Sequence, residues 1–164
     1  MPKLNWNDHT GRQWSCRVDL SDARRLRDNG NDIFDPRGGI AKLFSDVLET
    51  IEFIAELCRP EWEQSGMSYE QFSDCITGGE NVFRDASEAL KDGLCDFFRR
   101  LDRPALAMVI ERAWKTATAM ETQALENAGG EKVAGLLSAM MVKAQTEFEK
   151  AIDAESAKLQ KPGG

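Results

Sequence analysis

The sequence contains few of the residues from which catalytic and metal sites are built. It has a single histidine, His9, which lies among turn residues near the N-terminus. No two of its cysteines have the two-residue gap of a zinc knuckle or a redox motif; they are Cys16, Cys58, Cys75 and Cys95. We therefore expect no catalytic residue, no metal and no cofactor, so that the chain is predicted not to be an enzyme. Since each cysteine lies among apolar residues, all four are predicted to be reduced and buried.

Long apolar runs and an excess of positive charge are also missing. No run approaches the roughly 20 apolar residues that a membrane span needs, and the N-terminus lacks the pattern of a signal peptide. The formal net charge is -7, which opposes binding to a phosphate backbone. Residues 131–164 contain five lysines and five acidic residues, so the acidic excess lies in residues 1–130. These features predict a cytoplasmic protein with no membrane and no nucleic-acid partner.

What the sequence does contain is helical periodicity. Hydrophobic residues make up 41% and charged residues 30% of the chain, a composition that can form a globular core. One segment differs, because Trp14, Cys16 and Val18 alternate with polar residues as in a half-buried strand. That strand needs a partner, either residues 3–7 in a hairpin or another chain. The predicted fold class is all-α, mainly a helical bundle, with a short β-hairpin at the N-terminus if the first pairing holds.

Helices are predicted over 22–29, 40–58, 80–100, 104–127 and 131–160. A further short helix follows the capping box formed by Ser68 and Gln71. The 40–58 helix has its apolar stripe at steps of three and four, on Phe44, Val47, Leu48, Ile51, Ile54, Ala55 and Cys58. Phe53 falls on the polar side of this helix. We therefore predict that Phe53 is exposed and could belong to a docking surface.

The C-terminal helix is predicted to stand apart from the rest of the chain. Gly129 and Gly130 separate residues 1–128, a helical core domain with the N-terminal hairpin, from 131–160, a semi-detached amphipathic helix. Its apolar stripe is narrow and its flanks are charged, as in a helix that lies on another surface. The candidate partner-binding residues on this stripe are Leu137, Met141, Phe148 and Ile152. Packing of the same stripe within the chain is the alternative.

The order of these motifs over residues 10–115 resembles the tail assembly chaperones of tailed phages and prophages. The matching features are a strand with Trp14, an Ala-Arg-Arg-Leu helix at 23–26, Asp32-Ile33, a helix ending in Leu-Cys-Arg-Pro at 57–60, Gly-Met-Ser at 66–68 with Gln71-Phe72, Ala86, Ala89-Leu90 and Asp-Phe-Phe at 96–98. The likeness is one of helix lengths and apolar positions, and it includes no catalytic signature.

The resemblance implies a non-catalytic helper in the cytoplasm of a host cell. Such chaperones cover the long tape-measure protein and bring tail-tube subunits to it, so both proteins become expected partners, and a homo-oligomer is compatible with this role. Covering an amphipathic helix suits a helical protein with a groove. Two alternatives stay open, a virion structural or connector protein and a small regulatory adaptor that binds a host protein.

Overall fold

The computed structural model describes residues 1–38, 40, 43–127 and 132–160, without the side chains of 132–137 and 160. Within this part of the chain it has one two-stranded sheet and seven α-helices. The elements are β1 (Asn5–Asn7), β2 (Gln13–Ser15), α1 (Leu20–Asp28), α3 (Val47–Leu57), α4 (Arg59–Gln64), α5 (Tyr69–Thr77), α6 (Val82–Arg100), α7 (Pro104–Glu126) and α8 (Lys132–Gln160). The predicted mainly helical fold with an N-terminal hairpin is confirmed. None of the described helices is long and apolar enough to cross a membrane.

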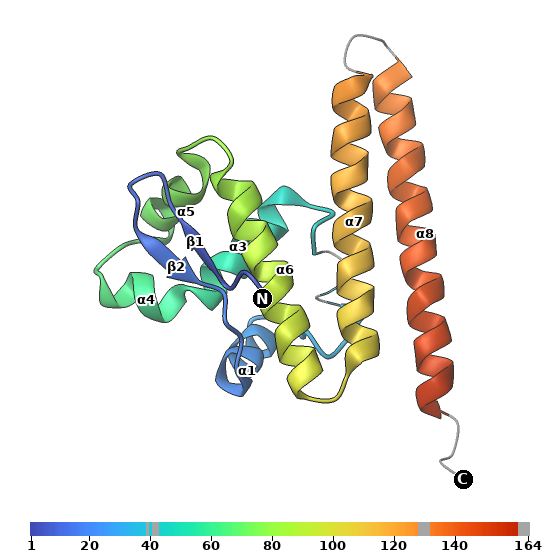
Figure 1. Cartoon of the computed structure of the whole chain (residues 1–164), viewed down its shortest axis with the longest axis horizontal. Helices are drawn as coiled ribbons and strands as arrows, with labels where there is room; N and C mark the ends of the chain where they lie inside the picture. Colours follow the sequence, from blue (N-terminus) through green and yellow to red (C-terminus); the bar gives the residue numbers. More distant parts are fainter. Residues whose placement is uncertain (39, 41–42, 128–131, 161–164) are drawn as a thin grey trace.

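Helix α6 lies at the centre of the molecule (Figure 1). The β-hairpin, α3 and α5 contact α6 from one side, and α1 packs on α3. Helix α7 packs along the other side of α6, and α8 runs antiparallel beside α7. The molecule therefore consists of a compact body around α6 and a helical hairpin, α7–α8, attached to that body through α7 and through the C-terminal half of α8.

The β-hairpin forms within the chain, as one of the two predicted pairings requires. Its strands are antiparallel, with Trp6 opposite Trp14. Both indoles are buried and pack on Phe72 of α5, with the Trp14 and Phe72 ring centroids 4.9 Å apart. Since edge-to-face aromatic pairs stabilise packing beyond their buried area, this cluster fastens the hairpin to the body.

A glycine in α6 allows the hairpin to approach the helix backbone. A Cβ atom at Gly93 would lie 1.9 Å from the carbonyl oxygen of Cys16, which follows β2. No real pair of atoms comes that close, so any side chain at position 93 would push the hairpin away. The isolated glycine in the predicted 80–100 helix therefore has a packing role.

The structure corrects the start and the rotation of the predicted 40–58 helix. Helix α3 begins at Val47, where the Asp46 side chain accepts hydrogen bonds from the backbone N–H groups of Leu48 and Glu49. Just before it, Phe44 has a φ of 68°, a left-handed conformation that interrupts any continuous helix. Val47 and Leu48 were predicted to face the core, but in this first turn they are exposed.

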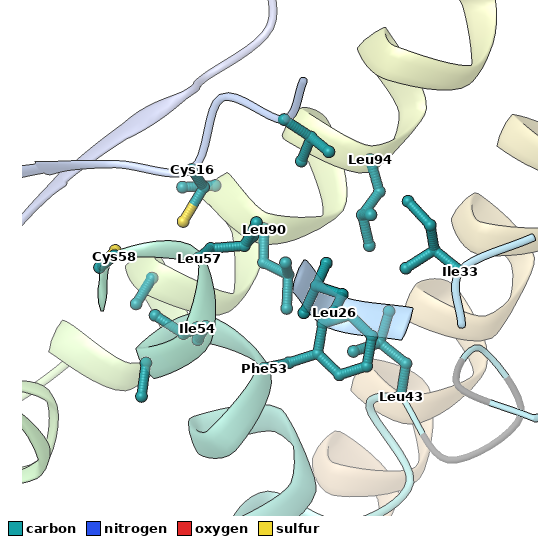
Figure 2. Close-up of a cluster of buried hydrophobic side chains, with 14 of the residues drawn as sticks. Cys16, Leu26, Ile33, Leu43, Phe53, Ile54, Leu57, Cys58, Leu90 and Leu94 are labelled. Carbon is teal, nitrogen blue, oxygen red and sulfur yellow. The ribbon is translucent and has the colours of Figure 1, made fainter. Parts of the chain in front are cut away.

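Phe53 is the largest correction. It was predicted to lie on the polar side of its helix, yet it is 1% exposed and belongs to the hydrophobic core. Figure 2 shows its ring beside Leu26 of α1, within the cluster that α3, α6 and the loop after α1 enclose. Because α1 covers one flank of α3 and α6 covers another, α3 is buried over a wider arc than an amphipathic stripe predicts.

The remaining helices follow the predictions with small changes. Ser68 and Gln71 form the predicted capping box of α5. α6 and α7 have nearly the predicted bounds. The short helix α4 was not predicted. Proline disfavours the interior of a helix, but Pro60 occupies the first turn of this new helix, where its missing N–H costs nothing.

Candidate functional site

The thiols and the histidine are used for packing. Among the described residues, no group of three or more His, Cys, Asp or Glu side chains could hold a metal ion. His9 lies against the glycine pair after α5, since a Cβ atom at Gly78 would come within 2.8 Å of its Nδ1 atom. All four cysteines are buried and unpaired.

Cys16 and Cys58 lie at one edge of the core cluster in Figure 2. A hydrogen bond with Cys16, together with burial, raises the pKa of the Cys58 thiol well above its ordinary value. Burial likewise raises the pKa of Cys95 to about 11. Since the thiolate is the reactive and metal-binding form, these two cysteines are protonated and unreactive at neutral pH.

Asp8 is the most perturbed carboxylate, and it organises the hairpin turn. Burial alone would raise its pKa, but hydrogen bonds from the Thr10 hydroxyl, the Trp14 indole and the backbone N–H groups of Thr10 and Arg12 lower that pKa to about 2. The distances are 2.6 Å from Thr10 Oγ1, 2.9 Å from Trp14 Nε1 and 3.1 Å from the Arg12 nitrogen. Every one of these donors belongs to the hairpin itself, so the charge stabilises the turn and holds the Trp14 ring in place.

The α7–α8 hairpin is the part of the molecule with the least intramolecular cover. The first turns of α7 are anchored in the body through Ala107, Val109 and Ile110, all of which are buried. From residue 111 to the end of α7, every residue is half-buried or exposed. Figure 1 shows the end of α7 and the start of α8 extending beyond all other elements. Near the body, the Trp114 ring still packs on Phe44, and the Glu111 carboxylate pairs with Arg99 of α6. Beyond these contacts, the outer halves of α7 and α8 pack mainly on each other.

The lower half of α8 packs on its own chain. Phe148 packs against the main core cluster, and Ile152 is 2% exposed. Arg37, in the loop after α1, forms an ion pair with Asp153 of α8. The C-terminal helix therefore rests on the body at this end and only its first half is held by α7 alone.

The structure separates the candidate partner-binding residues into three groups. Phe53 and Ile152 are buried within the chain, so neither presents a free side chain to another protein in this structure. Phe148 is half-buried against the core, and Met141 is 49% exposed. The side chain of Leu137 lies outside the described residues.

Three large exposed apolar side chains lie in the outer half of the hairpin. Leu125 is 77% exposed, Met141 49% and Val142 66%; we call these three residues the tip surface. Leu125 was not predicted, although its place near the end of an amphipathic helix was a signal. Large exposed apolar side chains that lie near one another mark interaction sites more often than isolated ones do.

A shallow groove runs between α7 and α8 along the outer half of the hairpin. Its lining residues are Lys115, Thr116, Ala119, Met120, Gln123, Met140, Lys143, Ala144 and Glu147. The floor is apolar and small, with alanines and methionines, while charged residues lie along the rims. No residue of the tip surface lines this groove.

Comparison of the chain with known protein families, with curated protein sequences and with solved structures finds no match in any of the three. The candidate site therefore rests on geometry alone: a helical hairpin that projects from a packed body, with an apolar tip surface and a groove with charged rims.

Proposed function

We propose that this chain is a non-catalytic assembly chaperone that binds other proteins through the tip surface of the α7–α8 hairpin. The observation that supports the proposal is the exposure of Leu125, Met141 and Val142 in the outer half of the α7–α8 hairpin, toward the end that extends beyond the other elements in Figure 1. A client helix laid along this end would supply the missing packing, with its anchors at helical spacing.

The expected strength of such a contact suits a transient helper. Burial of three partly exposed side chains would contribute about 3–6 kcal/mol, at roughly 1.5–3 kcal/mol for each fully buried one. Part of that gain is lost when the partners give up translational freedom. Methionine adapts to irregular surfaces, which favours a client that binds and leaves over a permanent partner.

The clients are proposed from the resemblance to the tail assembly chaperones. They are the tape-measure protein, whose long amphipathic helix must stay covered until the tail polymerises, and the tail-tube protein. In this proposal the chain acts in the host cytoplasm and is absent from finished particles. A virion structural protein with the same fold would instead remain in them, and an adaptor would bind a host protein without either client.

Co-expression tests the proposal. The tagged chain is co-expressed with the tape-measure and tail-tube proteins encoded beside it, and the purified complex is analysed by mass spectrometry. We expect at least one of the two to co-purify with the wild-type chain and to be lost with Met141→Asp. The matched control is Ala154→Asp, which adds the same charge at an exposed position of α8 that lies outside both the tip surface and the groove. Binding that survives Met141→Asp, or no binding at all, would exclude this role for the tip surface.

A further inference from the structure

We propose that the groove face of the α7–α8 hairpin binds a second copy of this chain, antiparallel and face to face, so that two hairpins form a four-helix bundle. Four-helix bundles bury the apolar faces of their helices by packing antiparallel helices around a common core. The groove opens between two helices that no third element covers over their outer halves. A second hairpin of the same shape would complete the missing half of the bundle.

The charges on α7 are self-complementary for this arrangement. Arg112 and Glu126 are exposed and lie seven residues before and after Ala119, which lines the groove. Seven residues are close to two helical turns, so all three share one face of α7. In an antiparallel pair with a two-fold axis at Ala119, Arg112 of each copy lies opposite the partner's Glu126.

The charges on α8 repeat the pattern on the other rim. Lys143 and Glu147 line the groove and lie two residues before and after Gln145. A two-fold axis at Gln145 places Lys143 of each copy opposite the partner's Glu147. Among the described residues, neither of these side chains, nor Arg112 or Glu126, has an ion-pair partner within its own chain, whereas many charges of the body are paired.

A single two-fold axis accommodates the charge pairs of both α7 and α8. The groove is lined by residues 115–123 of α7 and 140–147 of α8, whose midpoints are Ala119 and the bond between Lys143 and Ala144. The axis required by the α8 charges lies about 1.5 residues from that midpoint, or about 2 Å along the helix. A small tilt between the hairpins absorbs this difference, so the two charge patterns point to the same register.

The packing and the area agree with a dimer of modest affinity. Ala119 and Ala144 allow the helices to approach closely, and Met120 and Met140 fill the space between them. Exposed Met108 lies eleven residues before Ala119, three turns away on the same face, and extends this surface. From residue 108 to residue 126 the face is about 27 Å long and two helices, or about 20 Å, wide. Two such faces bury about 1,100 Å², just above the roughly 1,000 Å² expected of a specific interface.

Self-association uses other residues than client binding does, because no residue of the tip surface lines the groove. The test is therefore a charge exchange that leaves the tip surface unchanged. The acidic variant is Arg112→Glu with Lys143→Glu, and the basic variant is Glu126→Arg with Glu147→Lys. In a homodimer of either variant, all four pairs bring like charges together. In a heterodimer of one acidic and one basic chain, every pair again joins opposite charges.

Sedimentation equilibrium at low salt measures the outcome. We expect wild type to dimerise at tens of micromolar, each variant alone to dimerise at least tenfold more weakly, and the equimolar mixture to recover a heterodimer with nearly wild-type affinity.

Two single substitutions complete the test. Ala119→Lys, at the axis, should give a monomer that no mixture rescues. Glu121→Arg, two residues from Ala119 and so on the opposite side of α7, is the control and should change nothing. All the exchanged side chains are exposed, and circular dichroism verifies the fold. A wild-type chain that stays monomeric at 500 µM, variants that dimerise as wild type does, or a mixture without recovery would each overturn the proposal.

Discussion

The hydrogen-bonded carboxylate in the hairpin turn offers the sharpest test of how this fold is held together. Asp8→Asn keeps the size of the side chain but removes its charge. One Asn oxygen can still accept from Thr10 and Arg12, but the amide nitrogen then faces the Trp14 N–H, which loses its acceptor. A pKa lowered from 3.8 to about 2 corresponds to about 2 kcal/mol of stability at neutral pH. Allowing for solvent at the turn and for the unsatisfied indole, we expect a loss of about 2–3 kcal/mol.

The pH dependence of stability shows whether the charge of Asp8 causes this loss. The folded-state pKa of Asp8 lies below the unfolded value, so its stabilisation is complete above about pH 5 and is lost as the pH falls through 4 toward 2. The stability difference between wild type and Asp8→Asn should therefore narrow by about 2 kcal/mol over that window. Urea unfolding followed by tryptophan fluorescence measures it, with the exposed Asp28→Asn as the control that changes stability by less than about 0.5 kcal/mol. A difference that is absent at pH 7, or the same at pH 2.5, would refute the reasoning.

Four further substitutions test the packing by thermal or urea unfolding. Gly93→Ala should destabilise the fold by about 3 kcal/mol or more, since its methyl group meets the Cys16 carbonyl oxygen; wild-type stability would mean that the hairpin does not pack on α6. Phe53→Ala should cost about 3–5 kcal/mol as a core truncation, and a neutral effect would return Phe53 to the surface. Ile152→Ala should cost about 2–3 kcal/mol while Met141→Ala costs under about 1; equal losses would contradict the different burial of the two residues.

The sequence predictions that the structure confirms are those that depend on local sequence patterns. The alternation around Trp14 defined a strand, and the Ser68–Gln71 pair defined a helix start, because in both cases the determining contacts lie within a few residues of one another. Pro60 shows the limit of such signals, since one residue can end a helix or occupy the first turn of the next.

Long-range packing explains the predictions that failed. The periodicity of residues 40–58 could not reveal that Phe44 adopts a left-handed conformation, or that α1 would cover the flank of α3 that carries Phe53. The stripe on α8 likewise could not indicate what covers it. Ile152 is buried by its own chain whereas Met141, eleven residues earlier on nearly the same face, is half exposed, because the body reaches only the lower half of the helix.

The tip surface was therefore only partly predictable. Met141 was named from its stripe, while Leu125 and Val142 became candidates only when the structure showed that they are exposed on the projecting hairpin. The role of Asp8 was not visible either, since a carboxylate in a turn is common and only its contact with the Trp14 indole distinguishes it.

The central claim is that the tip surface binds a client during tail assembly. The most direct measurement is quantitative mass spectrometry of two fractions from cells that produce particles: the tagged chain purified from cytoplasm, and finished particles. The account predicts that the cytoplasmic fraction contains the tape-measure or tail-tube protein, that Met141→Asp removes it while Ala154→Asp does not, and that finished particles lack the chain. Stoichiometric amounts of the chain in finished particles, or a client that remains bound to the Met141→Asp variant, would contradict it.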